Sequence, residues 1–357
     1  MVRFFKFSKE VYVIIDNQLP VDSQDNFVFA RSEQNDEIWP CILEKAYAKL
    51  YGGYENIIAG KVHRVLAELT GGFPFEILIE TYKTNPNGLW QKMINSYTNG
   101  YLMGAGSPPH EDGDSAVSPQ GIVQGHAYSV LEAREVEGHK LIKLRNPHGR
   151  GGQEWTGDFS DESEFMTKRL MDLLKHVKED DGAFWMNLED FSQEFRSLYI
   201  CAIFDPLKWR SCRYQGEFTE ENSLGTPNKS DETFRNPQFG IKVTKKCTFF
   251  VSMSQENETA LEGKNSIYLR IQQNEGKRVM KSNLKSGEVF GNQLKPSKLV
   301  SVSNEATLEA EKYPYTFTLY VSCKNEGDTG RFSLQMYCND LDMELIEDKD
   351  FDRELFQ

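Results

Sequence analysis

The chain has 357 residues, of which 39% are hydrophobic and 27% are charged, and its formal net charge is −13. This length allows about two domains that each bury a core. The acidic balance argues against nucleic-acid binding, because phosphate contacts require clustered Lys and Arg. No run approaches the roughly 18–20 apolar residues of a transmembrane helix, and the six cysteines form no CxxC pair. We therefore expect a reduced, cytoplasmic protein.

The first part of the chain mixes predicted strands and helices. Residues 11–16 predict a buried strand that ends in a turn. Asp36 can cap a helix whose apolar residues between 38 and 50 fall on one face. A second helix is predicted from about Leu89 to Tyr97 and ends at Asn99-Gly100.

A predicted β-hairpin carries the most informative pair of side chains. Residues 126–134 and 140–145 predict two strands joined by a polar turn, and the second strand runs into Asn146. If the hairpin is symmetric about Val136, His126 lies across from Asn146, with Cβ atoms about 4.5–5.5 Å apart. A carboxamide there can hold an imidazole in one tautomer and orientation, as in a Cys–His–Asn site. The hairpin therefore predicts two members of a thiol-protease triad.

The segments around this hairpin differ in character. Residues 104–121 form a long loop with no regular pattern, which either borders the cleft beside His126 or is a solvated surface loop. A helix is predicted over about 161–178, a short helix over 189–195, and a strongly apolar strand over 198–204.

Beyond Trp209 the chain changes to short β-rich runs separated by polar turns, which predict an antiparallel sandwich. The acidic residues 340–357 predict a linker or a solvated end. The predicted strands cover residues 239–243, 248–253, 266–271, 298–302, 313–322 and 331–337.

Several segments of this sequence resemble the calpains, in the order in which that family carries them. They are Ile38-Trp-Pro-Cys-Ile-Leu-Glu-Lys-Ala-Tyr-Ala-Lys49, Thr70-Gly-Gly72, Gly125-His-Ala-Tyr-Ser129, Leu144-Arg-Asn-Pro147, Glu154-Trp-Thr-Gly157, Ala183-Phe-Trp-Met186 and, later, Asn236-Pro-Gln-Phe239. The resemblance covers about residues 4–338.

The resemblance implies an α+β fold, with the second, β-rich antiparallel half of a papain-like calpain core followed by an all-β sandwich, domain III. The implied domains are 1–206 for the core half, 207–340 for the sandwich and 341–357 for an acidic tail. It makes His126 the general base and acid, and Asn146 its orienting partner. His148 stands where the family usually has a tryptophan beside the catalytic pair.

The family's nucleophilic cysteine lies in a Gln-Gly-x-x-Gly-Asp-Cys-Trp pattern, which these 357 residues do not contain. Cys41 is the one cysteine near a predicted helix start, where the helix dipole could lower its pKa. It also falls on the apolar face of that helix, so we interpret it as a small core residue. The other five cysteines are interpreted as core or incidental, and we predict no endopeptidase activity from this chain alone.

Calpain cores bind calcium within this half, and the resemblance places Glu154, Asp161 and Asp181 at the site with the Glu179 backbone carbonyl. These hard oxygen donors suit calcium, which takes about 6–8 oxygens. The family carries a glutamate where this chain has Ala183, so we expect weakened or absent binding. The alternative is that the acidic residues 180–181 cap or solvate a turn.

The resemblance thus predicts a calpain-type, calcium-dependent cysteine endopeptidase that cleaves intracellular proteins, represented by a chain without the cysteine half. The expected partners are protein substrates or that missing half, and no nucleic acid. The alternative is a non-catalytic scaffold that binds phospholipid or protein partners through the sandwich.

Overall fold

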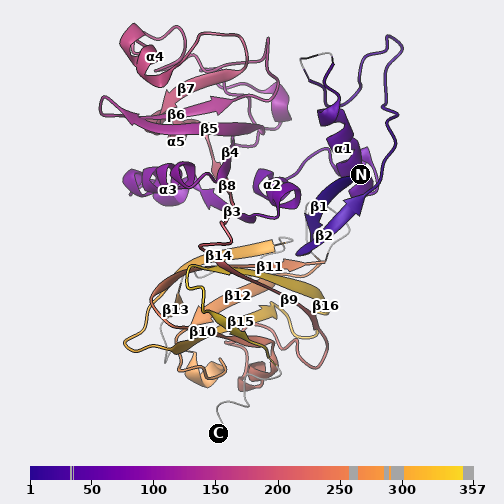
Figure 1. Cartoon of the computed structure of the whole chain (residues 1–357), viewed down its shortest axis with the longest axis vertical. Helices are drawn as coiled ribbons and strands as arrows, with labels where there is room; N and C mark the ends of the chain where they lie inside the picture. Colours follow the sequence, from indigo (N-terminus) through magenta and orange to yellow (C-terminus); the bar gives the residue numbers. More distant parts are fainter. Residues whose placement is uncertain (33, 35, 257–263, 285–288, 291–300, 349–357) are drawn as a thin grey trace. The chain divides into compact units, whose positions relative to one another are not determined.

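A computed structural model describes residues 1–32, 34, 36–256, 264–284, 289–290 and 301–348 (Figure 1). The chain divides into two compact units. We call the first the sandwich unit, which comprises Met1–Gly60, Glu68–Gly71 and Phe204–Gln357. The second, the sheet unit, comprises Lys61–Ala67 and Gly72–Ile203. The structure is α+β with antiparallel sheets, as the sequence predicts.

The N-terminal part of the sandwich unit begins with a hairpin of β1 (Val2–Lys6) and β2 (Lys9–Val13). The predicted strand over 11–16 is therefore the end of β2, which stops three residues earlier. Helix α1 (Trp39–Leu50) follows with Ile38 as its N-cap and no side-chain cap, so Asp36 does not cap it. The short helices η1 (Tyr54–Asn56) and α2 (Val62–Thr70) come next, and α2 runs from the sheet unit into the sandwich unit.

The sheet unit is built on six antiparallel strands in the order β3-β8-β4-β5-β6-β7. Its helices are α3 (Pro86–Thr98), α4 (Lys168–Leu174) and α5 (Leu188–Glu194), with the short helices η2 (Ile79–Tyr82) and η3 (Gly113–Ser115). The strands are β3 (Phe73–Leu78), β4 (Leu102–Gly106), β5 (Ala127–Val136), β6 (His139–Arg145), β7 (Ala183–Asn187) and β8 (Ser197–Ala202).

Both faces of this sheet are packed against other elements. Successive side chains of a strand point to opposite faces, so one strand contributes to both cores. On β6, Ile142 and Leu144 join a core that includes residues of α3 and α5. Leu141 faces the other side, where it packs with Trp185 and with Leu170 of α4. Figure 1 shows α3 and α4 on opposite faces of the sheet.

The predicted helix over 161–178 is wrong in extent, since only α4 is helical there. Before it, the backbone forms successive turns, and Phe159 has a positive φ of 64°. Thr167 caps the start of α4 by accepting from the Leu170 amide, and Lys175 ends it in the left-handed conformation. Local turn bonds therefore replace the first two helical turns that the apolar pattern suggests.

The β5–β6 hairpin has a register different from the expected one. Val136 pairs with His139, so the turn is the two residues Glu137-Gly138, both with positive φ, rather than a turn centred on Val136. A bulge then shifts the register, because Glu132 pairs with Lys143 but Val130 pairs with Leu144. Because of the bulge, Val130 and Ala133 point into the same core although they are three residues apart.

The β-sandwich has two antiparallel sheets, β13-β12-β15-β10-β17 and β14-β11-β16-β9. Apolar residues from both sheets form one core, with Phe249, Phe317 and Phe332 among its largest side chains. The elements are β9 (Arg210–Phe218), η4 (Asp231–Arg235), β10 (Gln238–Val243), β11 (Cys247–Gln255), β12 (Ile267–Gln272), η5 (Lys281–Asn283), β13 (Val289–Phe290), β14 (Ser301–Leu308), β15 (Tyr315–Cys323), β16 (Gly330–Cys338) and β17 (Glu344–Ile346).

Three predictions concern this region. The predicted strand over 298–302 overlaps β14, although its first three residues lie outside the described residues. The stretch expected as an acidic tail contains β17, which pairs with β10. The expected domain boundary after residue 206 stays a prediction. Among the described residues, no helix has the length and apolarity needed to cross a membrane.

Candidate active site

The side chains of His126 and Asn146 meet at the open end of the β5–β6 hairpin. His126 Nε2 lies 3.1 Å from Asn146 Oδ1. Asn146 Nδ2 donates to the Gln153 carbonyl at 3.0 Å, which turns Oδ1 towards the ring. His126 therefore donates from Nε2–H, and the neutral ring keeps its lone pair on Nδ1. No residue in the described ranges bonds that nitrogen, so the ring can accept a proton there.

Asn146 is fully buried and held from several sides. Its backbone amide donates to the Gly182 carbonyl at 2.8 Å, and its Oδ1 also accepts from the His148 amide at 3.1 Å. Gly182 has φ of +81°, and a Cβ there would lie 2.7 Å from the Asn146 carbonyl oxygen. A glycine is therefore required at this close approach. The amide that orients His126 is fixed by its surroundings.

His126 is half-buried and contacts Ser107, the residue after β4, and two aromatic rings. The Ser107 hydroxyl accepts from the His126 amide at 2.9 Å and donates to the Val123 carbonyl at 2.7 Å. The Tyr128 ring meets the His126 ring edge-on at 5.2 Å between centroids. The His148 ring lies at 4.6 Å and is tilted by 46°. His148, where the family usually has tryptophan, therefore contacts the ring of the candidate base.

The surroundings lower the pKa of His126 below its ordinary value of 6.5. Burial is the largest cause, the hydrogen bond to Asn146 opposes it, His148 lowers the pKa further, and the Asp114 carboxylate raises it. A lowered pKa favours the neutral ring at neutral pH, which is the form that can accept a proton.

The long loop before His126 is ordered by its own backbone. Gly125 donates to the Pro108 carbonyl at 2.7 Å, and Gln124 donates to the Ala116 carbonyl at 2.8 Å. Val117 and Val123 form an isolated β-bridge. Ser107, at the start of this loop, also donates from its amide to the His126 carbonyl at 3.0 Å, so the loop contacts the residue that carries the candidate base.

The six cysteines are free thiols, and all but Cys212 are buried. Cys41 is buried, and its thiol donates to the Ala30 carbonyl at 2.9 Å, as a small core residue would. Burial raises the pKa of Cys212 and raises that of Cys323 to about 12. A hydrogen bond with Cys247 lowers the pKa of Cys338, but both thiols are buried in the sandwich core.

The residues expected around calcium lie on loops that bond to one another. Glu154 Oε1 accepts from the Gly182 amide at 2.8 Å, and Asp181 Oδ1 accepts from the Ala183 amide at 2.8 Å. The Glu179 carbonyl accepts from the Asp181 amide at 2.9 Å. The last two bonds close the turn before β7, which is the alternative that the sequence left open.

The fourth of these residues, Asp161, is paired with a histidine that the sequence did not single out. His176 Nε2 lies 2.7 Å from Asp161 Oδ1. The His176 side chain is 3% exposed and that of Asp161 is 19% exposed. The imidazole is therefore hydrogen-bonded to the Asp161 carboxylate, and both side chains are mostly buried.

Negative charge does gather at these loops. Burial raises the pKa of Glu154, the Gly182 amide opposes this, and the carboxylates of Asp161, Asp180 and Asp181 raise it further. Within the described ranges, however, no group of three or more His, Cys, Asp or Glu side chains is arranged to hold a metal ion. As placed, these oxygens face N–H donors and do not fit a calcium ion. Calcium binding stays a prediction.

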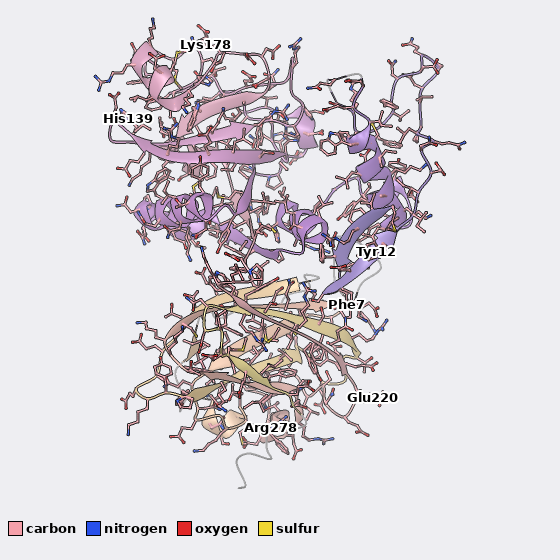
Figure 2. The ribbon with its side chains drawn as sticks, in the orientation of Figure 1. Phe7, Tyr12, His139, Lys178, Glu220 and Arg278 are labelled. Atoms are coloured by element: carbon pink, nitrogen blue, oxygen red, sulfur yellow. The ribbon has the colours of Figure 1, made fainter. Side chains whose placement is uncertain are left out.

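The three remaining histidines make no hydrogen bond or ring contact with His126 or Asn146 within the described residues. His139 is at the turn of the hairpin (Figure 2), where its ring contacts Phe159. His110 is an exposed loop residue beside Asp112. His63 is buried and stacks on Tyr199, and its Nδ1 has no hydrogen-bond partner among the described residues.

Sequence reasoning missed Ser107, Tyr128 and His176. Tyr128 could have been found, because residues 126 and 128 share a face of one strand. Ser107 and His176 come from other elements of the unit, and no local pattern links them to the site.

Comparisons with known proteins agree with the resemblance. A family model described as "Calpain family cysteine protease" matches residues 1–202. The calpain-type cysteine protease ADL1 of Oryza sativa subsp. japonica is 40% identical over 248 residues, which are 68% of this chain and 11% of that protein. Human calpain-14 is 33% identical over 278 residues, which are 71% of this chain and 39% of calpain-14. The chain thus spans well under half the length of these relatives.

Proposed function

This chain belongs to the calpain family of cysteine proteases, and from that premise we propose that it supplies the histidine–asparagine half of a cytoplasmic endopeptidase site. The observation that carries the proposal is the His126 Nε2 contact with Asn146 Oδ1 at 3.1 Å. It leaves Nδ1 of His126 as the atom that takes a proton from a thiol.

Each residue has a defined role in this proposal. His126 deprotonates the thiol and later protonates the leaving amine. Asn146 keeps the ring in the Nε2–H tautomer and stabilises the imidazolium that forms. The nucleophile and an oxyanion donor come from a polypeptide that carries the Gln-Gly-x-x-Gly-Asp-Cys-Trp pattern, because the buried Cys41 and Cys201 and the sandwich thiols do not suit that role. The substrates are peptide bonds of proteins.

The family's calcium dependence is part of this proposal only in a weakened form. Ala183 supplies no carboxylate, and Asp161 is bonded to His176. We assign no step of the reaction to a calcium ion.

The test is hydrolysis of a peptide substrate under reducing conditions, by the chain alone and with a separately prepared cysteine-bearing calpain half. We expect no thiol-dependent turnover by the chain alone and measurable turnover by the mixture. His126→Ala removes the general base and is expected to lower turnover of the mixture by about 10²–10⁴-fold. His139→Ala, which changes the histidine at the hairpin turn, is the matched control and is expected to leave turnover unchanged.

Two outcomes would contradict the proposal. Thiol-dependent turnover by the chain alone that is lost in His126→Ala would place the nucleophile within these residues. Turnover of the mixture that is insensitive to His126→Ala would deny the ring a catalytic role. The non-catalytic scaffold stays an alternative prediction, which calcium-dependent sedimentation of the chain with acidic liposomes would favour.

A further inference from the structure

His176 is placed by the end of α4 rather than by a free loop. Lys175 ends the helix in the left-handed conformation with φ of 53°, and the His176 amide donates back to the Met171 carbonyl at 2.9 Å. Leu170 and Leu174 anchor the same helix in the core against the sheet. The ring is therefore held near Asp161 by a helix end that packing fixes, so the 2.7 Å contact is part of the fold.

Direct hydrogen bonds join the neighbouring loops. The Gly151 amide donates to Asp180 Oδ1 at 2.9 Å, and the Gly182 amide donates to Glu154 Oε1 at 2.8 Å. The carbonyl of the same Gly182 accepts the Asn146 amide at 2.8 Å. The chain of bonds from Glu154 through Gly182 ends on the residue that orients His126.

We propose that His176 takes the place of a divalent cation in this half of the core, so that the His126–Asn146 pair is assembled without calcium. The Nε2–H of His176 satisfies Asp161, and the direct bonds between the loops hold Asn146. A calcium ion would have to break the bond between His176 and Asp161 and turn Glu154 away from Gly182. Ala183 would also offer the ion a methyl group in place of a carboxylate ligand. His176 is thus a positioning residue, and its meaning for catalysis rests on the proposed function.

The test measures the melting temperature of the full chain in 5 mM calcium, 5 mM magnesium or chelator at matched ionic strength. A site filled at about 100 times its dissociation constant raises the melting temperature of a chain of this size by about 5 °C or more. For the unchanged chain we expect no difference between calcium and magnesium.

Two variants separate the roles of residues 176 and 183. Ala183→Glu alone restores a carboxylate but leaves His176 on Asp161, so we expect no calcium shift. The double variant His176→Leu with Ala183→Glu frees Asp161 as well, and we expect a calcium-specific rise of about 5 °C. An equal rise in Ala183→Glu alone, or no rise in the double variant, would show that His176 does not keep the ion out.

The unchanged chain gives a second way to overturn the proposal. A calcium-specific rise that Asp161→Asn abolishes would show that Asp161 binds the ion despite His176. Glu162→Gln is the matched control, because Glu162 is the adjacent carboxylate with a 92% exposed side chain. None of these measurements uses turnover, so their failure is distinct from failure of the peptidase proposal.

Discussion

The two units of this chain differ in the polar groups that they bury. All six histidines lie in the sheet unit and none lies in the sandwich unit. Buried side-chain amides of the sandwich unit are hydrogen-bonded to backbone groups. Gln238, for example, accepts from the Val279 amide and donates to the Val279 carbonyl. The imidazoles of His63 and His126 each keep one nitrogen without a hydrogen bond among the described residues.

This difference separates polar groups that stabilise from polar groups that can react. A buried side-chain amide whose hydrogen bonds are all made to the protein rigidifies the core, and it has no donor or acceptor left for a substrate. An open ring nitrogen costs stability, but it can take up a proton when the pH falls below the ordinary histidine pKa of 6.5. The sheet unit should therefore respond to pH between about 4 and 7, and the packing of the sandwich core should not.

The largest expected effect tests the apolar core of the sandwich. Phe317→Ala removes a fully buried ring and should lower the free energy of unfolding by about 3–5 kcal/mol, measured by chemical denaturation. Phe234→Ala is the control, since Phe234 is 41% exposed, and should cost under about 1 kcal/mol. Equal losses in both variants would mean that the sandwich core is not tightly packed.

The next effect tests the pH response of the sheet unit. Burial lowers the pKa of His63 to about 4 in the folded chain. As the pH falls below 6.5, His63 is therefore protonated in the unfolded chain before it is protonated in the folded chain. Stability is therefore lost between about pH 6.5 and 4, by about 3 kcal/mol at pH 4 from this group. His63→Leu should flatten that part of the pH profile of unfolding. An unchanged acid profile would contradict a buried neutral ring.

Two buried amides compare the units directly. Asn146→Ala and Gln238→Ala each leave backbone partners without a bond and should each cost about 1–3 kcal/mol. Only Asn146→Ala should also lower the pKa of His126, because the lost hydrogen bond raises it. Nuclear magnetic resonance titration of the His126 ring measures this. A shift in the Gln238 variant as well would mean that the effect is not local.

The smallest effect concerns the neighbour of the candidate base. His148 lowers the pKa of His126 by its charge, so His148→Gln should raise that pKa with little change in stability. The sign is opposite to that of Asn146→Ala, and the same titration distinguishes them. If His126 titrates identically in His148→Gln and the unchanged chain, the ring contact has no electrostatic consequence.

Much of the sandwich was predictable because each strand signals itself locally. The predicted runs at 239–243 and 331–337 lie within β10 and β16, since alternation and polar turns determine such strands without distant information. The strands β3 and β9 were missed, because Pro74 interrupts one and charged residues the other.

The candidate site was predictable in its residues but not in its geometry. The sequence associates His126 with Asn146, yet the expected register of the hairpin was wrong, because neither the turn at Glu137-Gly138 nor the bulge follows from alternation alone. The pairing of Asp161 with His176 depends on where α4 ends. Such contacts join separate elements, and no local pattern encodes them.

The bulge at Leu131 also constrains how the length of this hairpin can vary. Strand side chains alternate with a period of two, so deleting that one residue would move His126 to the opposite face while Asn146 stayed in place. Adding or removing residues in pairs between the turn and the ring would preserve the pair. Insertions and deletions of an even number of residues in β5 should therefore keep His126 facing Asn146, and those of an odd number should not.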